Sequence, residues 1–576
     1  MKENSRFSIL FPYYEDTKYK QLSDSACHDL GLDTICRELT SDIKEQNLIM
    51  SIISNMTSDP RVAVYRQKVF VDILFLPDLR KQMSELFEKI EFIRNFTGSH
   101  IETDEKLGFW HLMHRLDELN DYIKCVEAMR ECLSNAKIKS EGLLNFKKHI
   151  DELYEEACFA EMKKDIAELK SKASGIQSVT LGINVNERFE AVSMGLVSVN
   201  NKPFKKSNIV SNFADAITSK NKLHEGTDWD GDMHYHQIDK NNDHSVGKFI
   251  ENAGAYMALR NTPFVDGRIR STVVKTPDGD GTANSTFYLD KVINKMLDSL
   301  IKKLRDTLTK YSDIAIVNIS QIIPEFMYYI RFAEYISKYM EKGFKFCKAQ
   351  LTDDENVSMD AKDLYNLKLA MNLRSSEDIV YNDLSFDNDH TIYILTGANR
   401  GGKTTITQAV GLTFVLAQGG IFVPASSFVY KPVDCIYTHF PADEDKTMDL
   451  GRLGEECVRF KSIYSECTSD SLLLLNETFS TTSFEEGFYI AKDSVKALLK
   501  KQVRVIYNTH MHKLAADVDE INMESEGVKA SSLIMKSDNG KRSFKVEVAS
   551  PEGLSYAKDI AEKYGVTYEM LIKQNM

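Results

Sequence analysis

The spacing of hydrophobic positions divides the chain into regions of different kinds. From Ser23 to about Lys172, apolar residues recur at every third or fourth position, and the same spacing returns from about Val246 to Lys348. That period places apolar side chains on one face of a helix. We therefore predict two helical regions, and within the second we expect long helices over Leu289–Tyr311 and Ile322–Phe346.

A short segment between these regions has a different period. Apolar and polar residues alternate over Val179–Val185 and again over Phe189–Val197, with Asn186–Arg188 between the two runs. Alternation with a period of two is typical of a β-strand, and the polar residues between the runs suit a turn. The sequence thus predicts a small β insertion inside a helical domain.

The last third of the chain changes again, to short apolar runs that alternate with helical segments. Ile392–Leu395 and Ser471–Leu475 are typical of buried strands, and Thr405–Gln418 has the pattern of an amphipathic helix. This arrangement begins near Leu373 and indicates an α/β domain with a parallel sheet. The 576 residues are enough for roughly two to four domains.

A glycine-rich sequence joins the first of these strands to the helix. It fits the phosphate-binding pattern G-x-x-x-x-G-K-[ST], and the strand-to-helix context is the one in which that pattern is informative. The backbone N–H groups of such a loop and the helix N-terminus hold phosphates. Lys403 is placed to reach the β- and γ-phosphates, and Thr404 to ligate Mg²⁺. The predicted nucleotide-binding residues of the loop are Gly397, Ala398, Asn399, Arg400, Gly401, Gly402, Lys403, Thr404 and Thr405.

A second nucleotide signature follows the strand Ser471–Leu475. It consists of Asn476 and Glu477, where the usual first residue is an aspartate that helps to hold Mg²⁺. An asparagine at this position can still accept a hydrogen bond from a metal-bound water, but it brings no charge. We expect Glu477 to polarise the attacking water as a general base and to stand beside the metal.

Composition and charge argue against several classes of protein. The formal net charge is −13, from 72 Lys and Arg against 85 Asp and Glu, which argues against a surface that coats nucleic acid indiscriminately. The nine cysteines form no C-x-x-C pair, and an odd count without metal spacing suggests reduced thiols. We see neither a secretory signal nor an apolar run long enough for a membrane span, so a cytoplasmic protein is expected.

The polar stretch Lys202–Asp243 holds two further candidate sites. Its lysines could contact nucleic-acid phosphates or could simply belong to a solvated loop, and the sequence leaves both interpretations open. Its histidines and aspartates have the chemistry of metal ligands, but their spacing matches neither an EF-hand loop nor a paired-histidine zinc helix, which favours an ordinary polar loop. The candidate residues are Lys202, Lys205 and Lys206 for phosphates, and His224, His234, His236 and His244 with the Asp228–Asp232 segment for a metal.

From Leu373 to Lys573 the chain resembles the ATPase domain of the MutS family of DNA mismatch-repair proteins. Residues 396–405 are similar to that family's T-G-P-N-M-G-G-K-S-T, and residues 476–487 lie without a gap on its D-E-[IL]-G-R-G-T-S-T-x-[DE]-G. Asn508–His510 resembles its A-T-H, whose histidine senses the γ-phosphate, and Asn382 begins a segment that the family places beside the adenine. The resemblance implies ATP and Mg²⁺ as cofactors and His510 and Lys403 as catalytic residues with Glu477.

A looser resemblance extends over much of the preceding chain. Residues 58–70 are similar to a segment near the start of the family's core and lever domain, and the β insertion falls where the family carries its DNA clamp. The resemblance implies a multidomain fold, in which an all-α core and lever with a small β clamp-like insertion precedes an α/β P-loop ATPase domain of the ABC type. The expected divisions are a helical core and lever over 1–178 and 246–372, the clamp-like insertion over 179–245, and an ATPase domain with a helical dimerisation segment over 373–576.

The chain also departs from the family pattern. The N-terminal mismatch-reading and connector domains are expected to be absent, because nothing before residue 60 resembles the wedge motif G-x-F-Y-E. Asn476 replaces the aspartate, and Phe479–Thr481 replaces G-R-G. The loop that family members present to the partner's γ-phosphate carries Ser-Thr, whereas Gly451 and Arg452 stand near that place here, so Arg452 could act in trans as an arginine finger.

These observations lead to one predicted function and two alternatives. We expect a homodimeric MutS-like ATPase that couples nucleotide-driven closure to clamping of mismatched, branched or distorted DNA, in repair or recombination. The first alternative is an ATP-dependent switch that acts on RNA, the ribosome or a protein partner, which the acidic charge favours. The second is a nucleotide-binding scaffold that hydrolyses ATP only slowly, which Asn476 favours.

Overall fold

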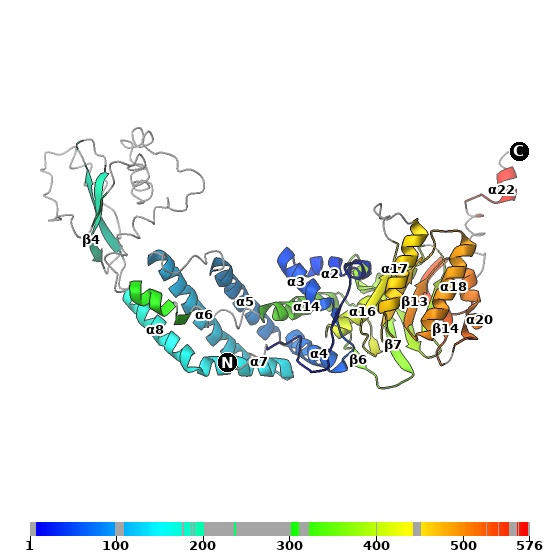
Figure 1. The fold of residues 1–576 in the computed structure, drawn as a ribbon, viewed down its shortest axis with the longest axis horizontal. Coiled ribbons are helices and arrows are strands. Elements are labelled where there is room, and N and C mark those ends of the chain that lie inside the picture. Colours follow the sequence, from blue (N-terminus) through cyan, green and yellow to red (C-terminus); the bar gives the residue numbers. More distant parts are fainter. Residues whose placement is uncertain are drawn as a thin grey trace. The chain divides into compact units, whose positions relative to one another are not determined.

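Figure 1 shows the fold in a computed structural model of the chain. The chain divides into two compact units. The first unit comprises residues 1–84, 133–148 and 322–576, and the second comprises residues 85–132 and 149–321. The residues that the structure describes are 7–97, 109–174, 178–185, 187, 191–200, 235–237, 301–308, 310–311, 322–398, 400–441, 451–525, 527–538, 541–551, 562 and 564–573.

A six-stranded sheet, counted over the described residues, organises the first unit. Its order is β11-β12-β13-β9-β14-β15, with parallel pairing from β11 to β14 and an antiparallel β15 at the edge. The strands are β9 (Ile392–Thr396), β11 (Ile436–His439), β12 (Leu472–Asn476), β13 (Arg504–Asn508), β14 (Ala530–Asp538) and β15 (Lys541–Val548). Every residue of β9, β12 and β13 is buried, as expected of central parallel strands that are covered on both faces.

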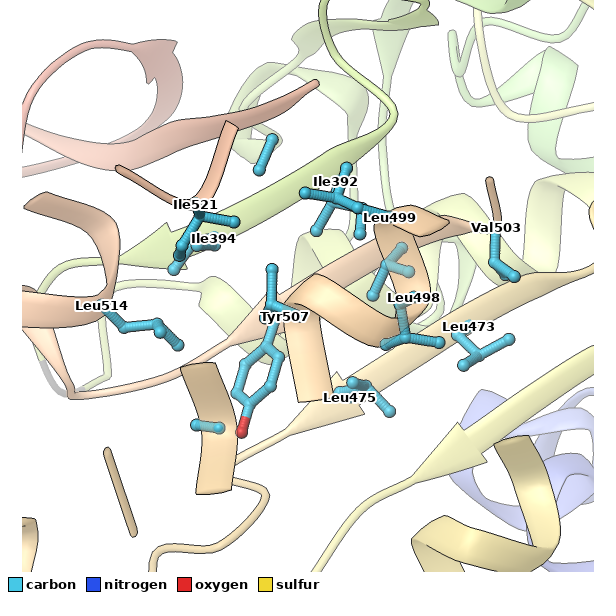
Figure 2. Packing of buried hydrophobic residues seen from close by; sticks show 14 of the residues in the cluster. Ile392, Ile394, Leu473, Leu475, Leu498, Leu499, Val503, Tyr507, Leu514 and Ile521 are labelled. Carbon is cyan, nitrogen blue, oxygen red and sulfur yellow. The ribbon is translucent and has the colours of Figure 1, made fainter. Parts of the chain in front are cut away.

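Helices from the C-terminal part cover one face of this sheet. Figure 2 shows Leu473, Leu475 and Tyr507 of the strands packed against Leu498 of α18, in a cluster of fully buried apolar side chains. Alternate strand residues point to this face, because successive side chains of a strand project to opposite sides. The helices here are α17 (Arg452–Glu466), α18 (Phe484–Lys500), α19 (His512–Ala516) and α20 (Val518–Asn522).

The opposite face of the sheet is covered by α16 (Lys403–Gln418), which packs on β12 and β13. We predicted an amphipathic helix over 405–418, and that prediction is wrong about its character, because α16 is buried on nearly every side. Helices α1 (Asp24–Leu30) and α4 (Pro60–Phe75) pack against its outer side. At Gly411 a Cβ atom would lie 2.5 Å from Leu30 and 2.6 Å from Leu474, so only glycine allows this close approach.

The C-terminal part of the first unit contains a second sheet, of four strands among the described residues. Its order is β6-β10-β7-β8, and β7 pairs antiparallel with both of its neighbours. β7 precedes Leu373, where we predicted the α/β region to begin, so the sheet crosses that boundary. The elements of this part are β6 (Gln350–Leu351), β7 (Val357–Leu364), α15 (Leu367–Ala370), the 3₁₀ turn η3 (Ser376–Asp378), β8 (Asn382–Asp387) and β10 (Ser427–Tyr430).

The N-terminal segments of the first unit form a helical layer. Arg66 of α4 is buried there, and its guanidinium donates to the carbonyl oxygens of Leu10 and Gln418. The helix predicted over 322–346 ends at Glu341, since Gly343 adopts a φ of 86°. The remaining elements of this unit are β1 (Lys20–Gln21), α2 (Leu32–Leu39), α3 (Ile43–Ile53), β2 (Asn55–Met56), α14 (Ile323–Glu341) and α22 (Tyr568–Lys573).

The second unit is built from helices and carries a β hairpin. Helical residues 301–308 and 310–311 pack with α8, where the Tyr311 hydroxyl donates to Asp165 over 2.9 Å. The predicted β insertion is confirmed as an antiparallel pair, to which β5 adds a strand that we did not predict. The elements that lie wholly or partly in this unit are α5 (Pro77–Thr97), α6 (Phe109–Asn135), α7 (Glu141–Glu155), α8 (Ala157–Ser174), β3 (Ser178–Val185), β4 (Ala191–Asn200) and β5 (Tyr235–Gln237). Among the helices of the described residues, none combines the length and the apolar character that crossing a bilayer requires.

Candidate nucleotide site

The glycine-rich loop between β9 and α16 has a backbone that only glycine tolerates at two of its positions. Gly397 and Gly402 adopt φ values of 139° and 97°, which residues with a Cβ atom rarely adopt. A Cβ atom on Gly397 would also lie 2.7 Å from the Cβ atom of Met535 on β14. The loop is therefore fixed both by its own conformation and by the neighbouring strand.

Lys403, the first residue of α16, holds a buried ammonium group. Its Nζ donates to the carbonyl oxygens of Gly397 and Ala398, over 2.9 Å and 3.4 Å. Burial lowers the pKa of this amine, and the negative charge of Glu477 opposes the shift. Among the described residues, Nζ forms these two hydrogen bonds and no ion pair. The loop thus encloses a cation that is not directly paired with a described carboxylate, which suits an anionic ligand.

Three polar side chains, those of Thr404, Asn476 and Asn508, are joined by hydrogen bonds. The Thr404 hydroxyl donates to Asn476 Oδ1 over 3.2 Å, and Asn508 Nδ2 donates to the same oxygen and, over 3.4 Å, to Thr404 Oγ1. Asn476 and Asn508 are paired in the register of β12 and β13, so the sheet itself brings them together. We predicted Thr404 and Asn476 as metal-site residues but assigned no role to Asn508. The signal for Asn508 was its position at the end of the neighbouring strand.

Glu477 and His510 form the polar edge of the site. His510 Nε2 lies 2.7 Å from Glu477 Oε1, and the Glu477 backbone N–H donates to the carbonyl oxygen of Asn508. Glu477 adopts a φ of 55°, a left-handed conformation that is uncommon for a residue with a side chain. The backbone therefore turns sharply at the end of β12, and the carboxylate lines the same cleft as Lys403.

A cleft of about 450 Å³ runs from the loop to an apolar end. At that end the Asn382 side chain accepts from the Val546 N–H over 2.8 Å and donates to the Phe544 carbonyl over 3.1 Å. Sequence reasoning found Asn382 but missed the aromatic ring of Phe544, which lines the cleft beside Ile379. The lining residues are Tyr365, Asn366, Leu369, Asp378, Ile379, Val380, Asn382, Arg400, Gly401, Gly402, Lys403, Thr404, Thr405, Ile406, Glu477, His510 and Phe544.

The turn after Glu477 is anchored by buried contacts. The Thr478 hydroxyl lies 3.0 Å from Nδ1 of His439, whose Nε2 lies 3.3 Å from the carbonyl oxygen of Glu456 on α17. Burial, together with the nearby Arg459, lowers the pKa of His439 to about 4. A neutral imidazole fits these contacts, because Nδ1 then accepts from the hydroxyl while Nε2–H donates to the carbonyl.

The remaining residues that we predicted as site residues do not line this cleft or lie outside the described residues. Gly451 caps the N-terminus of α17 and Arg452 begins that helix, and neither lines the cleft of its own chain. Asn399, the three lysines at 202, 205 and 206, and the histidines at 224, 234 and 244 lie outside the described residues. His236 falls within β5, of which only the backbone is described.

Comparison with known proteins identifies two family models that match this chain. A model described as MutS domain V matches residues 393–574, and one described as the MutS2 N-terminal domain matches residues 58–338. The first match contains the lysine of the loop, the Asn476–Glu477 pair and His510. The second contains the helices and the β hairpin of the second unit.

Individual relatives match mainly over the C-terminal region. The DNA mismatch repair protein MutS of Prochlorococcus marinus (strain MIT 9301) is 30% identical over 203 residues, which are 35% of this chain and 22% of that protein. Endonuclease MutS2 of Thermus thermophilus is 28% identical over 194 residues, which are 34% of this chain and 25% of the relative. The DNA mismatch repair protein MutS of Rickettsia akari is 28% identical over 246 residues, or 40% of this chain and 27% of the relative. The matches thus span about a quarter of the length of these relatives.

Proposed function

Because the chain belongs to the MutS family, we propose that it binds ATP with Mg²⁺ in the cleft beside β9 and hydrolyses it. The observation that carries this proposal is the buried Lys403 ammonium, whose hydrogen bonds to described residues all go to backbone carbonyl oxygens of its own loop. A buried cation without a counter-ion is costly unless a ligand neutralises it. The β- and γ-phosphates supply that negative charge, and the N-terminus of α16 adds a favourable dipole.

The residues behind Lys403 fit a magnesium ion. Thr404 Oγ1 would ligate the metal, and Asn476 would accept a hydrogen bond from a metal-bound water. Both are oxygen donors of the kind that Mg²⁺ prefers. When bound, the metal neutralises the charge that develops on the phosphates. Because Asn476 is uncharged, the protein contributes less negative charge here than an aspartate would, so we expect weak metal affinity and slow turnover.

Glu477 is the proposed general base. Its carboxylate lines the cleft and takes a proton from the attacking water. His510 lies 2.7 Å from this carboxylate, so it fixes the orientation of Glu477 and is placed to respond to the γ-phosphate. At the other end of the cleft, the ring of Phe544 offers an apolar surface to the adenine, and Asn382 holds the Phe544 backbone in place.

We propose further that the active form is a homodimer in which Arg452 completes the partner's site. Arg452 begins α17 and does not line the cleft of its own chain. Its guanidinium has the chemistry of an arginine finger, which stabilises the charge of a phosphate in a facing subunit. ATP binding would then cause the two ATPase domains to close around the nucleotide.

The proposed substrate is distorted duplex DNA, held by the β hairpin and by Lys202, Lys205 and Lys206. The proposed divisions are a helical core and lever over 1–178 and 246–372, a clamp-like insertion over 179–245 and an ATPase domain over 373–576. The relatives that are described as DNA mismatch repair proteins support a role in DNA repair, and we extend the proposal to recombination and to a cytoplasmic location. Phosphate contacts predict affinity that falls steeply with salt and shows little sequence preference.

The test is ATP hydrolysis by the full chain in the presence of duplex, mismatched and branched DNA, and of structured RNA. We expect a DNA with a junction or a mismatch to stimulate hydrolysis more than a matched duplex or RNA does. Stimulation by RNA alone would replace DNA with RNA as the substrate class. A protein that binds ATP but shows no turnover with any of these ligands would instead be a nucleotide-binding scaffold, a second candidate that the uncharged Asn476 favours.

A further inference from the structure

Among the described residues that line the nucleotide cleft, Arg400 is the only arginine. It belongs to the glycine-rich loop and shares the lining of the cleft with Lys403 and Glu477. Arg400 is exposed, and it forms neither a hydrogen bond nor an ion pair with another described residue. Its guanidinium is therefore available to a ligand that enters the cleft.

The backbone of the loop does not explain an arginine at this position. Arg400 adopts a φ of 58°, a left-handed conformation that favours glycine over any residue with a Cβ atom. The side chain makes no polar contact within the described part of the chain that would offset this strain. A strained residue at a ligand-binding loop is a reason to look for a function of its side chain.

Two departures from the motif that this loop and the following signature resemble change the charge of the site in the same direction. Methionine and aspartate stand in the motif where this chain has Arg400 and Asn476. With the motif residues, Lys403 would face two carboxylates, at position 476 and at Glu477. In this chain, two cations share the loop end of the cleft with Glu477 alone. Asp378, the other acidic residue of the lining, precedes β8 at the apolar end.

This charge balance changes what the cleft requires of its ligand. The phosphates of a nucleotide are strongly negative, and they must be neutralised when they leave water. Where the surrounding protein is acidic, a magnesium ion supplies much of that neutralisation. With an added cation at 400 and no carboxylate at 476, the protein itself supplies more of it. Magnesium therefore contributes less to affinity here than the motif residues would require.

We propose that Arg400 binds the phosphates together with Lys403, so that the cleft takes up a metal-free nucleoside triphosphate almost as tightly as its magnesium complex. This inference rests on the proposed binding of ATP and adds a binding residue and a form of the ligand to it. Because Arg400 is exposed, salt screens its charge. Affinity for the metal-free nucleotide should therefore fall as the ionic strength rises.

The experiment measures equilibrium binding of a fluorescent, non-hydrolysable ATP analogue to the full chain, once in EDTA and once in excess Mg²⁺. For wild type, we expect dissociation constants that differ by less than about threefold between the two conditions. For Arg400→Met, affinity in EDTA should fall by about tenfold or more, because a charge-assisted contact with a phosphate is lost. Its affinity in Mg²⁺ should fall by less than about threefold, since the metal replaces part of the missing charge.

Three comparisons separate charge from the structure of the loop. Arg400→Lys keeps the charge and should retain most of the affinity in EDTA, whereas Asn476→Asp restores a carboxylate and should weaken binding in EDTA more than in Mg²⁺. Added KCl should weaken binding in EDTA more for wild type than for Arg400→Met. Arg37→Met is the matched control, because Arg37 is an exposed residue of α2 that does not line the cleft. It should change neither dissociation constant.

An equal loss of affinity by Arg400→Met in EDTA and in Mg²⁺ would assign Arg400 to the structure of the loop. No loss in either condition would leave it an ordinary surface arginine, and either result overturns the inference. Wild-type binding that requires Mg²⁺ would also overturn the inference while the proposed function stands. If wild type binds the analogue in neither condition, the proposed function itself fails.

Discussion

His510 Nε2 lies 2.7 Å from Glu477 Oε1, so the imidazole and the carboxylate form one unit at the carboxyl ends of β13 and β12. The two residues are far apart in the sequence, and the parallel pairing of their strands brings them together. The contact gives Glu477 a fixed orientation at the edge of the cleft. It also gives the carboxylate a partner that a phosphate can compete for.

Glu477→Gln should separate nucleotide binding from hydrolysis. The glutamine keeps the shape of the side chain but cannot take a proton from water, so we expect turnover to fall by about 100-fold or more. Affinity for ATP should change little, because Lys403 is untouched. Glu485→Gln, at an exposed position of α18, is the matched control. Equal turnover in Glu477→Gln and in wild type would remove Glu477 from the mechanism.

Arg452 can be tested by mixing two inactive variants. If Arg452 acts on the partner's nucleotide, a dimer of one Lys403→Ala chain and one Arg452→Ala chain contains one intact site. Equal mixing should then restore about a quarter of wild-type turnover, since about half of the dimers are mixed and each has one of two sites. If Arg452 acted within its own chain, every site would carry a defect, and the mixture would stay inactive.

The left-handed backbone of Phe479 predicts an unusual ranking of two variants, in which the glycine variant is more stable than the alanine variant. Its side chain is buried and lies edge-on to Phe460, with ring centroids 5.4 Å apart, although its φ is 61°. The left-handed backbone costs roughly 1–2 kcal/mol, whereas truncation of a buried phenylalanine costs about 3–5 kcal/mol. Packing therefore outweighs strain, and Phe479→Gly should lower the free energy of unfolding by roughly 2–3 kcal/mol.

Phe479→Ala is the matched comparison in the same denaturant titration. It loses the same ring but keeps the strained backbone, so it should be less stable than Phe479→Gly by about 1 kcal/mol. Alanine is ordinarily the more stabilising of the two residues. An alanine variant more stable than the glycine variant would contradict the left-handed conformation at this position.

Because His439 is buried in its neutral form, we predict that the folded protein loses stability in mild acid. Its pKa is about 4 in the folded protein and ordinarily about 6.5, so between these values the unfolded chain binds the proton and the folded chain does not. The contribution of His439 to the free energy of unfolding is fully present above about pH 6.5. It is lost as the pH falls toward 4, and the loss amounts to roughly 3 kcal/mol in all. His439→Gln should flatten this part of the curve of unfolding free energy against pH. An unchanged slope would mean that His439 is not buried in its neutral form.

The sequence predicted the elements of the site whose signal is local. The order of strand, glycine loop and helix lies within one segment, and so does the apolar run that ends in Asn476 and Glu477. Asn508 and Phe544 were missed because their roles depend on which strands are neighbours. β13 lies beside β12, and β15 brings Phe544 against Asn382 of β8. No local pattern encodes those pairings.

The character of α16 was misjudged for a related reason. Its polar residues suggested a solvent-facing side, yet they are satisfied within the fold. The Thr407 and Thr413 hydroxyls donate to carbonyl oxygens four residues earlier, and the Gln418 side chain bonds to backbone groups of Thr57 and Val433. Helices from the N-terminal part cover the side that an isolated α/β domain would leave exposed.

The most direct test of the account is the equilibrium binding of ATP in the presence of Mg²⁺ to wild type and to Lys403→Ala. Lys529→Ala is the control, because Lys529 is an exposed lysine that pairs with Asp389 away from the cleft-lining residues. We predict saturable binding by wild type and by the control, and an affinity at least about tenfold lower for Lys403→Ala, since two phosphates lose their buried cation. Undiminished binding by Lys403→Ala, or no binding by wild type, would contradict the central claim that this loop holds a nucleoside triphosphate.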